Sequence, residues 1–66
     1  MKFKVGDIIK GKANGYTITN EDMKEAEVKK ILPENCMEIE IIEHEYPSRN
    51  GTRYEVVNQS EFFELI

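Results

Sequence analysis

The stretch CMEIEIIEHEY, residues 36–46, decides how this chain folds. Its first half alternates strictly, with Met37, Ile39 and Ile41 separated by single glutamates. Successive side chains of a β-strand point to opposite faces, so this alternation predicts a strand with one apolar and one acidic face. We therefore expect the three apolar residues to lie in the core.

The second half of the stretch breaks that alternation. A regular strand would carry Glu43 and Glu45 onto the apolar face, where each unpaired carboxylate costs several kcal/mol. One extra residue, a β-bulge at Ile41–Ile42, restores the phase. The bulge is expected to bring three later residues onto the apolar face: Ile42, His44 and Tyr46.

With the bulge in place, four glutamates share the outer face and form what we call the acidic ridge: Glu38, Glu40, Glu43 and Glu45. The ridge has two interpretations. It is a solvated face beside Lys29, Lys30 and Arg53, where each cross-strand pair of opposite charge contributes about 0.2 to 1 kcal/mol. Alternatively, it is an electrostatic docking surface for a basic partner.

Turn-forming residues divide the rest of the chain into short segments. Strand periodicity is found in KFKVGDIIKGKA (2–13), EAEVKKIL (25–32) and TRYEVVN (52–58). The first of these has Phe3 and Val5 on one side and bends at Gly6–Asp7, and the last has Tyr54 and Val56 on its apolar face. The sequence PENC after Leu32 predicts a hairpin loop.

Two short turns are also predicted. Thr19 and Asp22 resemble a capping box, which predicts one helical turn over residues 20–24, with Ile18 and Met23 as its anchors. Near the end of the chain, Ser60 is expected to cap a 3₁₀ turn. The last segment would then close the core through one of three residues: Phe63, Leu65 or Ile66.

This order of elements resembles the SH3-like barrels. The resemblance is carried by FKVGDIIKGK as the opening strand, AEVKKIL and MEIEII as the next hairpin, and YEVVNQSEFFELI as the ending. It is closest to small barrels of Gram-positive bacteria and their phages. It implies one all-β domain over residues 1–66: a five-stranded SH3-like barrel with a helical turn in its long first loop and a 3₁₀ turn before the last strand. No active site is carried over with it.

Composition argues against several functions. The single cysteine, Cys36, excludes an intramolecular disulfide and a cysteine-rich zinc site. The single histidine, His44, is eight residues away, about 26 Å along an extended strand, which disfavours a catalytic pair. No phosphate loop or metal-ligand spacing occurs. We therefore expect no enzyme, cofactor or metal site. Apolar runs never exceed two residues, so we expect neither signal peptide nor membrane span and a cytoplasmic location.

The remaining function is binding of another macromolecule, most simply a protein. The expected loop-side contact residues are Tyr16, Ile18, Tyr46, Arg49 and Arg53, because tyrosine and arginine are common in binding hot spots. The acidic ridge is a second candidate surface. Ile8 and Val57 are expected to point outward, where neighbouring loops would cover them or a homodimer would bury them.

Two alternatives remain open. The acidic ridge would suit a phage-type inhibitor of a host defence or DNA-processing protein. Alternatively, four lysines near the N-terminus would form a patch that binds nucleic acid: Lys2, Lys4, Lys10 and Lys12. The net charge of −4 opposes this second alternative, because phosphate binding relies on a basic face.

Overall fold

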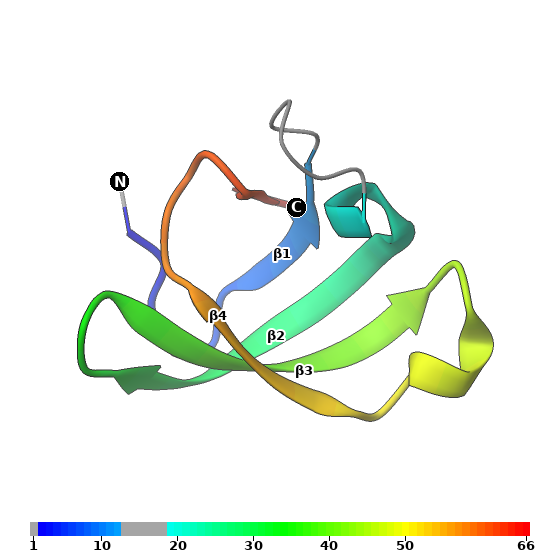
Figure 1. The fold of residues 1–66 in the computed structure, drawn as a ribbon, viewed down its shortest axis with the longest axis horizontal. Helices are drawn as coiled ribbons and strands as arrows, with labels where there is room; N and C mark the ends of the chain where they lie inside the picture. The colour runs from blue at the N-terminus through cyan, green and yellow to red at the C-terminus, as the bar shows by residue number, and fades with distance from the viewer. Residues whose placement is uncertain (1, 13–18) are drawn as a thin grey trace.

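The computed structural model describes residues 2–12 and 19–66, which form one antiparallel sheet (Figure 1). Its order is β4-β3-β2-β1-β5, so the last strand lies beside the first. The strands are β1 (Ile8–Gly11), β2 (Met23–Leu32), β3 (Cys36–His44), β4 (Arg53–Val57) and β5 (Phe63–Leu65). Two 3₁₀ turns accompany them, η1 (Thr19–Asp22) and η2 (Pro47–Arg49). The all-β prediction is confirmed, and the sheet stays open between its edge strands β4 and β5.

The predicted hairpin loop joins the two longest strands. β2 ends at Leu32 and β3 begins at Cys36, directly opposite it. Glu34 and Asn35 have positive φ angles of 62° and 60°. Residues 33–35 thus form a three-residue hairpin loop in which two consecutive residues have left-handed φ angles. The loop therefore fixes the register of the central hairpin.

The predicted bulge is confirmed. Ile41 lies opposite Ala26 and Glu43 lies opposite Glu25, so Ile42 has no partner on β2. Met37, Ile39 and Ile41 are buried, and Glu43 and Glu45 are exposed. The bulge therefore shifts the alternation by one residue, so that Glu43 and Glu45 point to solvent as their spacing requires.

The residues that follow the bulge are less buried than expected. Ile42 is 42% exposed because it is the unpaired residue of the bulge. Tyr46 is 57% exposed because β3 ends at His44 and the chain then turns into η2. Only His44 of the three is half-buried, opposite the buried Met23. The expectation that all three join the apolar face is therefore wrong for Ile42, whereas Tyr46 lies on the same side as the core residues Ile39 and Ile41 but is not buried.

The core lies on the inner face of the sheet. Val56 and Phe62 pack against it, and the Phe3 and Phe63 rings meet edge to face with centroids 6.3 Å apart. At the end of the chain, only Phe63 closes the core, since Leu65 and Ile66 are exposed. The buried apolar residues are Phe3, Ile9, Met23, Ala26, Val28, Met37, Ile39, Ile41 and Phe63.

The N-terminal arm does not form the strand that its alternation predicts. Residues 2–4 pair with no strand in the part of the chain that the structure describes, and Val5 is exposed. The side chain of Asn58 takes the place of a neighbouring strand. Its Oδ1 accepts a hydrogen bond from the Phe3 N–H at 2.8 Å, and its Nδ2 donates to the Phe3 carbonyl at 3.0 Å. Asn58 is only 3% exposed, so one buried amide holds the arm against the core.

The two predicted turns are shifted. The turn after the first loop is η1, and Met23 is already the first residue of β2. Before β5, residues 60–62 form a turn in which the Phe62 N–H bonds to the Gln59 carbonyl at 3.2 Å, and no 3₁₀ helix forms there. η2 was not predicted, although Pro47 suits the first position of a helical turn. In the described residues no helix is long and apolar enough to cross a membrane.

Candidate functional site

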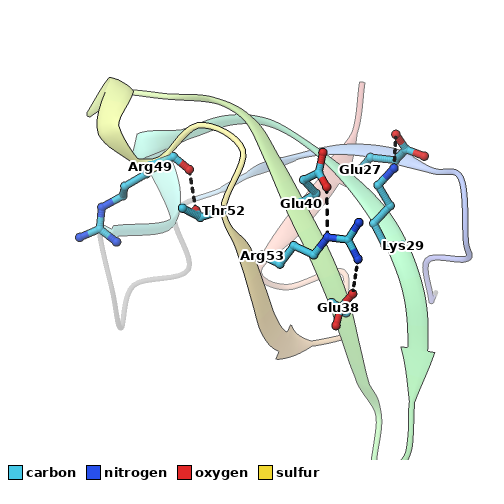
Figure 2. Close-up of polar contacts among 7 residues, drawn as sticks. All are labelled: Glu27, Lys29, Glu38, Glu40, Arg49, Thr52 and Arg53. Atoms are coloured by element: carbon cyan, nitrogen blue, oxygen red, sulfur yellow. Dashed lines mark hydrogen bonds and ion pairs between the residues drawn. The ribbon is translucent and has the colours of Figure 1, made fainter.

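The acidic ridge lies on the outer face of the sheet, where Arg53 neutralises half of it. The Arg53 Nε donates to Glu40 and its Nη1 donates to Glu38, each at 3.1 Å. Figure 2 shows the guanidinium reaching across β3 between the two carboxylates. These hydrogen bonds, first to Glu40 and then to Glu38, raise the pKa of Arg53 above its usual value. Arg53 therefore lies on this face and not with the loop-side residues.

The rest of the ridge is mixed in charge. Glu45 pairs with Lys24 at 3.5 Å, and Lys29 pairs with Glu27 at 3.3 Å on the neighbouring strand. Glu43 makes no ion pair within the described part of the chain, and it lies opposite another glutamate, Glu25. Three of the four ridge carboxylates thus have a cation beside them, as the solvated-face interpretation expects.

A pocket of about 470 Å³ opens on the inner side of the sheet, and we call it the tyrosine pocket. Tyr46 and Tyr54 are its exposed aromatic residues, and Arg49 comes from η2. Buried core residues form its apolar part. The lining residues are Asp22, Met23, Ile39, Ile41, His44, Tyr46, Arg49, Tyr54, Glu55, Val56 and Phe63.

Short hydrogen bonds fix the rim of this pocket. His44 Nδ1 accepts from the Tyr46 N–H at 3.0 Å, and the two rings lie 5.7 Å apart. Asn50 Oδ1 accepts from the His44 N–H at 2.8 Å, which ties the end of η2 back to β3. Arg49 Nη1 donates to the Tyr54 hydroxyl at 3.2 Å. The tyrosine rings are therefore positioned by local contacts around η2.

The structure brings together only part of the predicted loop-side set. Tyr46 and Arg49 share the tyrosine pocket, whereas Tyr16 and Ile18 lie outside the described residues. Sequence reasoning missed Tyr54, which its alternation had assigned to the apolar face. Tyr54 is on that face, but it remains 38% exposed because β4 is an edge strand. Position at a sheet edge was the missing information.

The hydroxyl of Tyr54 ionises more readily than that of a free tyrosine. Hydrogen bonding by Thr52, and then by Arg49, lowers its pKa from the usual 10.0. A depressed pKa contributes stability that is present above the unfolded-state pKa and lost as the pH falls through the folded-state value. We therefore expect Arg49→Ala to raise the pKa of Tyr54 and to destabilise the fold more in alkali than at pH 7. Absorbance titration at 295 nm in a background that carries both Tyr16→Phe and Tyr46→Phe checks this, and an unchanged Tyr54 transition would contradict it.

The N-terminal lysines are divided between the arm and β1 with the residue that follows it. Lys2 and Lys4 are exposed on the arm, while Lys10 on β1 pairs with Glu64 at 3.3 Å. Lys10 and Lys12 line a second depression of about 430 Å³ together with acidic residues. The lining of this depression is Lys10, Gly11, Lys12, Glu21, Met23, Lys24 and Glu64. Its mixed charge gives little preference for phosphate groups.

Cys36 and His44 are the two residues whose catalytic pairing the sequence disfavours. Cys36 lies beside the hairpin loop, half-buried, with its Sγ 3.5 Å from the Glu34 carbonyl oxygen. His44 lies at the far end of β3 and uses Nδ1 as an acceptor. Among residues 2–12 and 19–66, no group of three histidine, cysteine or acidic side chains is placed to hold a metal ion. Comparison of the chain with protein-family models, curated proteins and solved structures gave no significant match.

Proposed function

We propose that this chain is a non-enzymatic protein-interaction module that binds an extended segment of a partner protein in the tyrosine pocket. The observation that carries the proposal is the composition of the pocket. Tyr46 is 57% exposed and Tyr54 38% exposed, yet both lie over an apolar floor. Tyrosines with this exposure and a nearby arginine are the residues that most often dominate binding energy.

The pocket also suits a peptide because its rim is already ordered. The Tyr46 ring lies against the His44 ring, and Arg49 donates to the Tyr54 hydroxyl, so both tyrosine side chains are partly ordered before a peptide binds. The floor includes Val56 and Ile41, which offer contact to an apolar side chain. Arg49 at the rim can bind a backbone carbonyl or carboxylate of the same segment. The partner we propose therefore presents one apolar or aromatic side chain within an extended segment.

The SH3-like architecture belongs to the same proposal. The last strand lies beside the first, and the bulged hairpin of β2 and β3 forms the centre of the sheet. This order supports an open variant of the small barrels that the sequence resembles, including those of Gram-positive bacteria and their phages. A cytoplasmic, protein-binding role is part of the same proposal.

The binding of peptides to variants tests the proposal. Peptides selected from a random displayed library on the immobilised wild-type protein are titrated by calorimetry. Tyr46→Ala is expected to weaken binding at least about tenfold, because hot-spot truncation commonly costs more than about 1.4 kcal/mol. The matched control is Glu43→Gln on the outer face, which is expected to leave the affinity unchanged.

The opposite pattern of results would refute peptide binding in the tyrosine pocket. If Glu43→Gln weakened binding while Tyr46→Ala did not, the contact surface would be the acidic ridge and the inhibitor alternative would gain support. Because Tyr46 is exposed, its replacement is not expected to unfold the chain. An amide NMR spectrum of each variant confirms that the fold is intact before affinities are compared.

A further inference from the structure

The outer edge of β4 is an unpaired strand edge. β4 pairs with β3 and with no other strand in the described part of the chain. At either end of this ladder, the Thr52 carbonyl accepts from Ile41 and the Asn58 N–H donates to Asn35. Every second residue between Thr52 and Asn58, Tyr54 among them, therefore directs its backbone N–H and C=O groups towards β3.

The residues of the other phase face away from the sheet. The N–H and C=O groups of Arg53 and Glu55 therefore point to the open edge of β4. Such an edge is a template for another strand, and edge charges usually discourage that pairing. Arg53 and Glu55 carry opposite charges and lie two residues apart on this edge. These charges discourage pairing with most other strands, but an antiparallel copy of β4 can place each charge opposite its complement.

Within the described residues, no cation pairs with Glu55. It lies opposite Glu38 on β3, and Arg53 binds Glu38 and Glu40. No ion pair within residues 2–12 and 19–66 involves Glu55. A carboxylate on an open edge, facing a like charge, is stabilised when an arginine comes opposite it on a new strand.

We propose that a second copy of this chain pairs antiparallel with β4, in the register centred on Tyr54. In that register Arg53 of each copy lies opposite Glu55 of the other, and the two pairs exchange about four backbone hydrogen bonds. Registers centred on Arg53 or on Glu55 place identical charges opposite each other. A register centred on Val56 places Glu55 opposite Val57 and forms no ion pair.

The proposed pairing also joins two copies of the tyrosine pocket. Tyr54 faces Tyr54 of the second copy as a non-hydrogen-bonded pair, with Cα atoms about 4.5 Å apart. Each Tyr54 lines its own pocket, so the two pockets adjoin across the twofold axis. The dimer does not depend on the proposed peptide binding, and its tests measure only association.

Association is measured first by sedimentation equilibrium. The wild-type chain is expected to approach twice its mass of 7.7 kDa as its concentration rises. Glu55→Arg places like charges across the interface and is expected to weaken association at least tenfold. The same change puts a cation opposite Glu38, so the variant should melt no lower than the wild type. The matched control, Glu61→Arg, makes the same charge change in an exposed turn and should leave association unchanged.

Cross-linking then tests the register. In a Cys36→Ser background, Tyr54→Cys is expected to form a disulfide-linked dimer under mild oxidation, because non-hydrogen-bonded pairs have suitable Cα separations. Cysteine at Glu61 should cross-link far more slowly. A monomer at millimolar concentration, a dimer that survives Glu55→Arg, or faster cross-linking from Val56→Cys than from Tyr54→Cys would each overturn the proposal.

Discussion

Asn58→Ala is expected to lower the free energy of unfolding by about 2 to 4 kcal/mol. The change removes two hydrogen bonds of 2.8 and 3.0 Å and leaves the N–H and C=O of a buried residue, Phe3, without partners. An unsatisfied buried polar group costs about 1 to 3 kcal/mol. The stability of a chain this short is roughly 3 to 10 kcal/mol, so the loss is a large share of the total. Urea unfolding followed by circular dichroism measures it.

A double-mutant cycle shows whether Asn58 acts through the N-terminal arm. Phe3→Ala alone is expected to cost about 3 to 5 kcal/mol, since Phe3 is 3% exposed and meets Phe63. If Asn58 holds the arm, Phe3→Ala costs much less in the Asn58→Ala background, because the arm has already left the core. Costs that add without coupling would show that Asn58 stabilises the chain by another route.

Asn58→Asp supplies a control that responds to pH. A protonated carboxyl can accept from the Phe3 N–H and donate to the Phe3 carbonyl, as the amide does. Burial raises the pKa of a carboxyl, so the folded-state value lies above the unfolded-state value. The stabilising contribution is then fully present below the unfolded-state pKa and is lost as pH rises through the folded-state pKa. The gap between this variant and the wild type should therefore be smallest in acid.

The sequence predicted the parts of the fold that local pattern controls. The bulge followed from the position of Glu43, because a carboxylate cannot remain in the core without a partner. The hairpin loop followed from Pro33 and its neighbours. The role of Asn58 could not be predicted, since its partner Phe3 is 55 residues away and both hydrogen bonds depend on tertiary packing. The N-terminal arm was wrongly assigned to a strand. Its alternation indicates that Phe3 is buried, but it does not indicate whether another strand lies beside Phe3.

The candidate site was predictable only in part, for a similar reason. Tyr46 and Arg49 could be proposed from residue type and from their place near a turn. Tyr54 was assigned to the apolar face correctly, but the exposure that places it on the pocket rim follows from the open edge of β4. The acidic ridge was located correctly and Arg53 was expected beside it, whereas the simultaneous contact of Arg53 with Glu38 and Glu40 depends on the register of β4 against β3. Sheet register is not encoded in the pattern of a single strand.

Two adjacent isoleucines test the bulge itself. Ile41→Ala is expected to cost about 2 to 4 kcal/mol, while Ile42→Ala is expected to cost less than about 1 kcal/mol. The substitution and the residue type are identical, so hydrophobicity and strand propensity cannot separate them. Burial separates them: Ile41 is 3% exposed and Ile42 is 42% exposed. Urea unfolding of both variants measures the contrast.

The two costs depend on the position of the unpaired residue. Ile41 is paired with Ala26 on β2, and its N–H and C=O bond to Thr52 and Gly51 on the other side, so its side chain is fixed in the core. Ile42 has no partner on β2 and leaves little void when it is shortened. Equal costs for the two substitutions would mean that both side chains pack in the core, as the sequence alone had suggested. A reversed order would move the unpaired residue to Ile41, and the phase of Glu43 would then need another explanation.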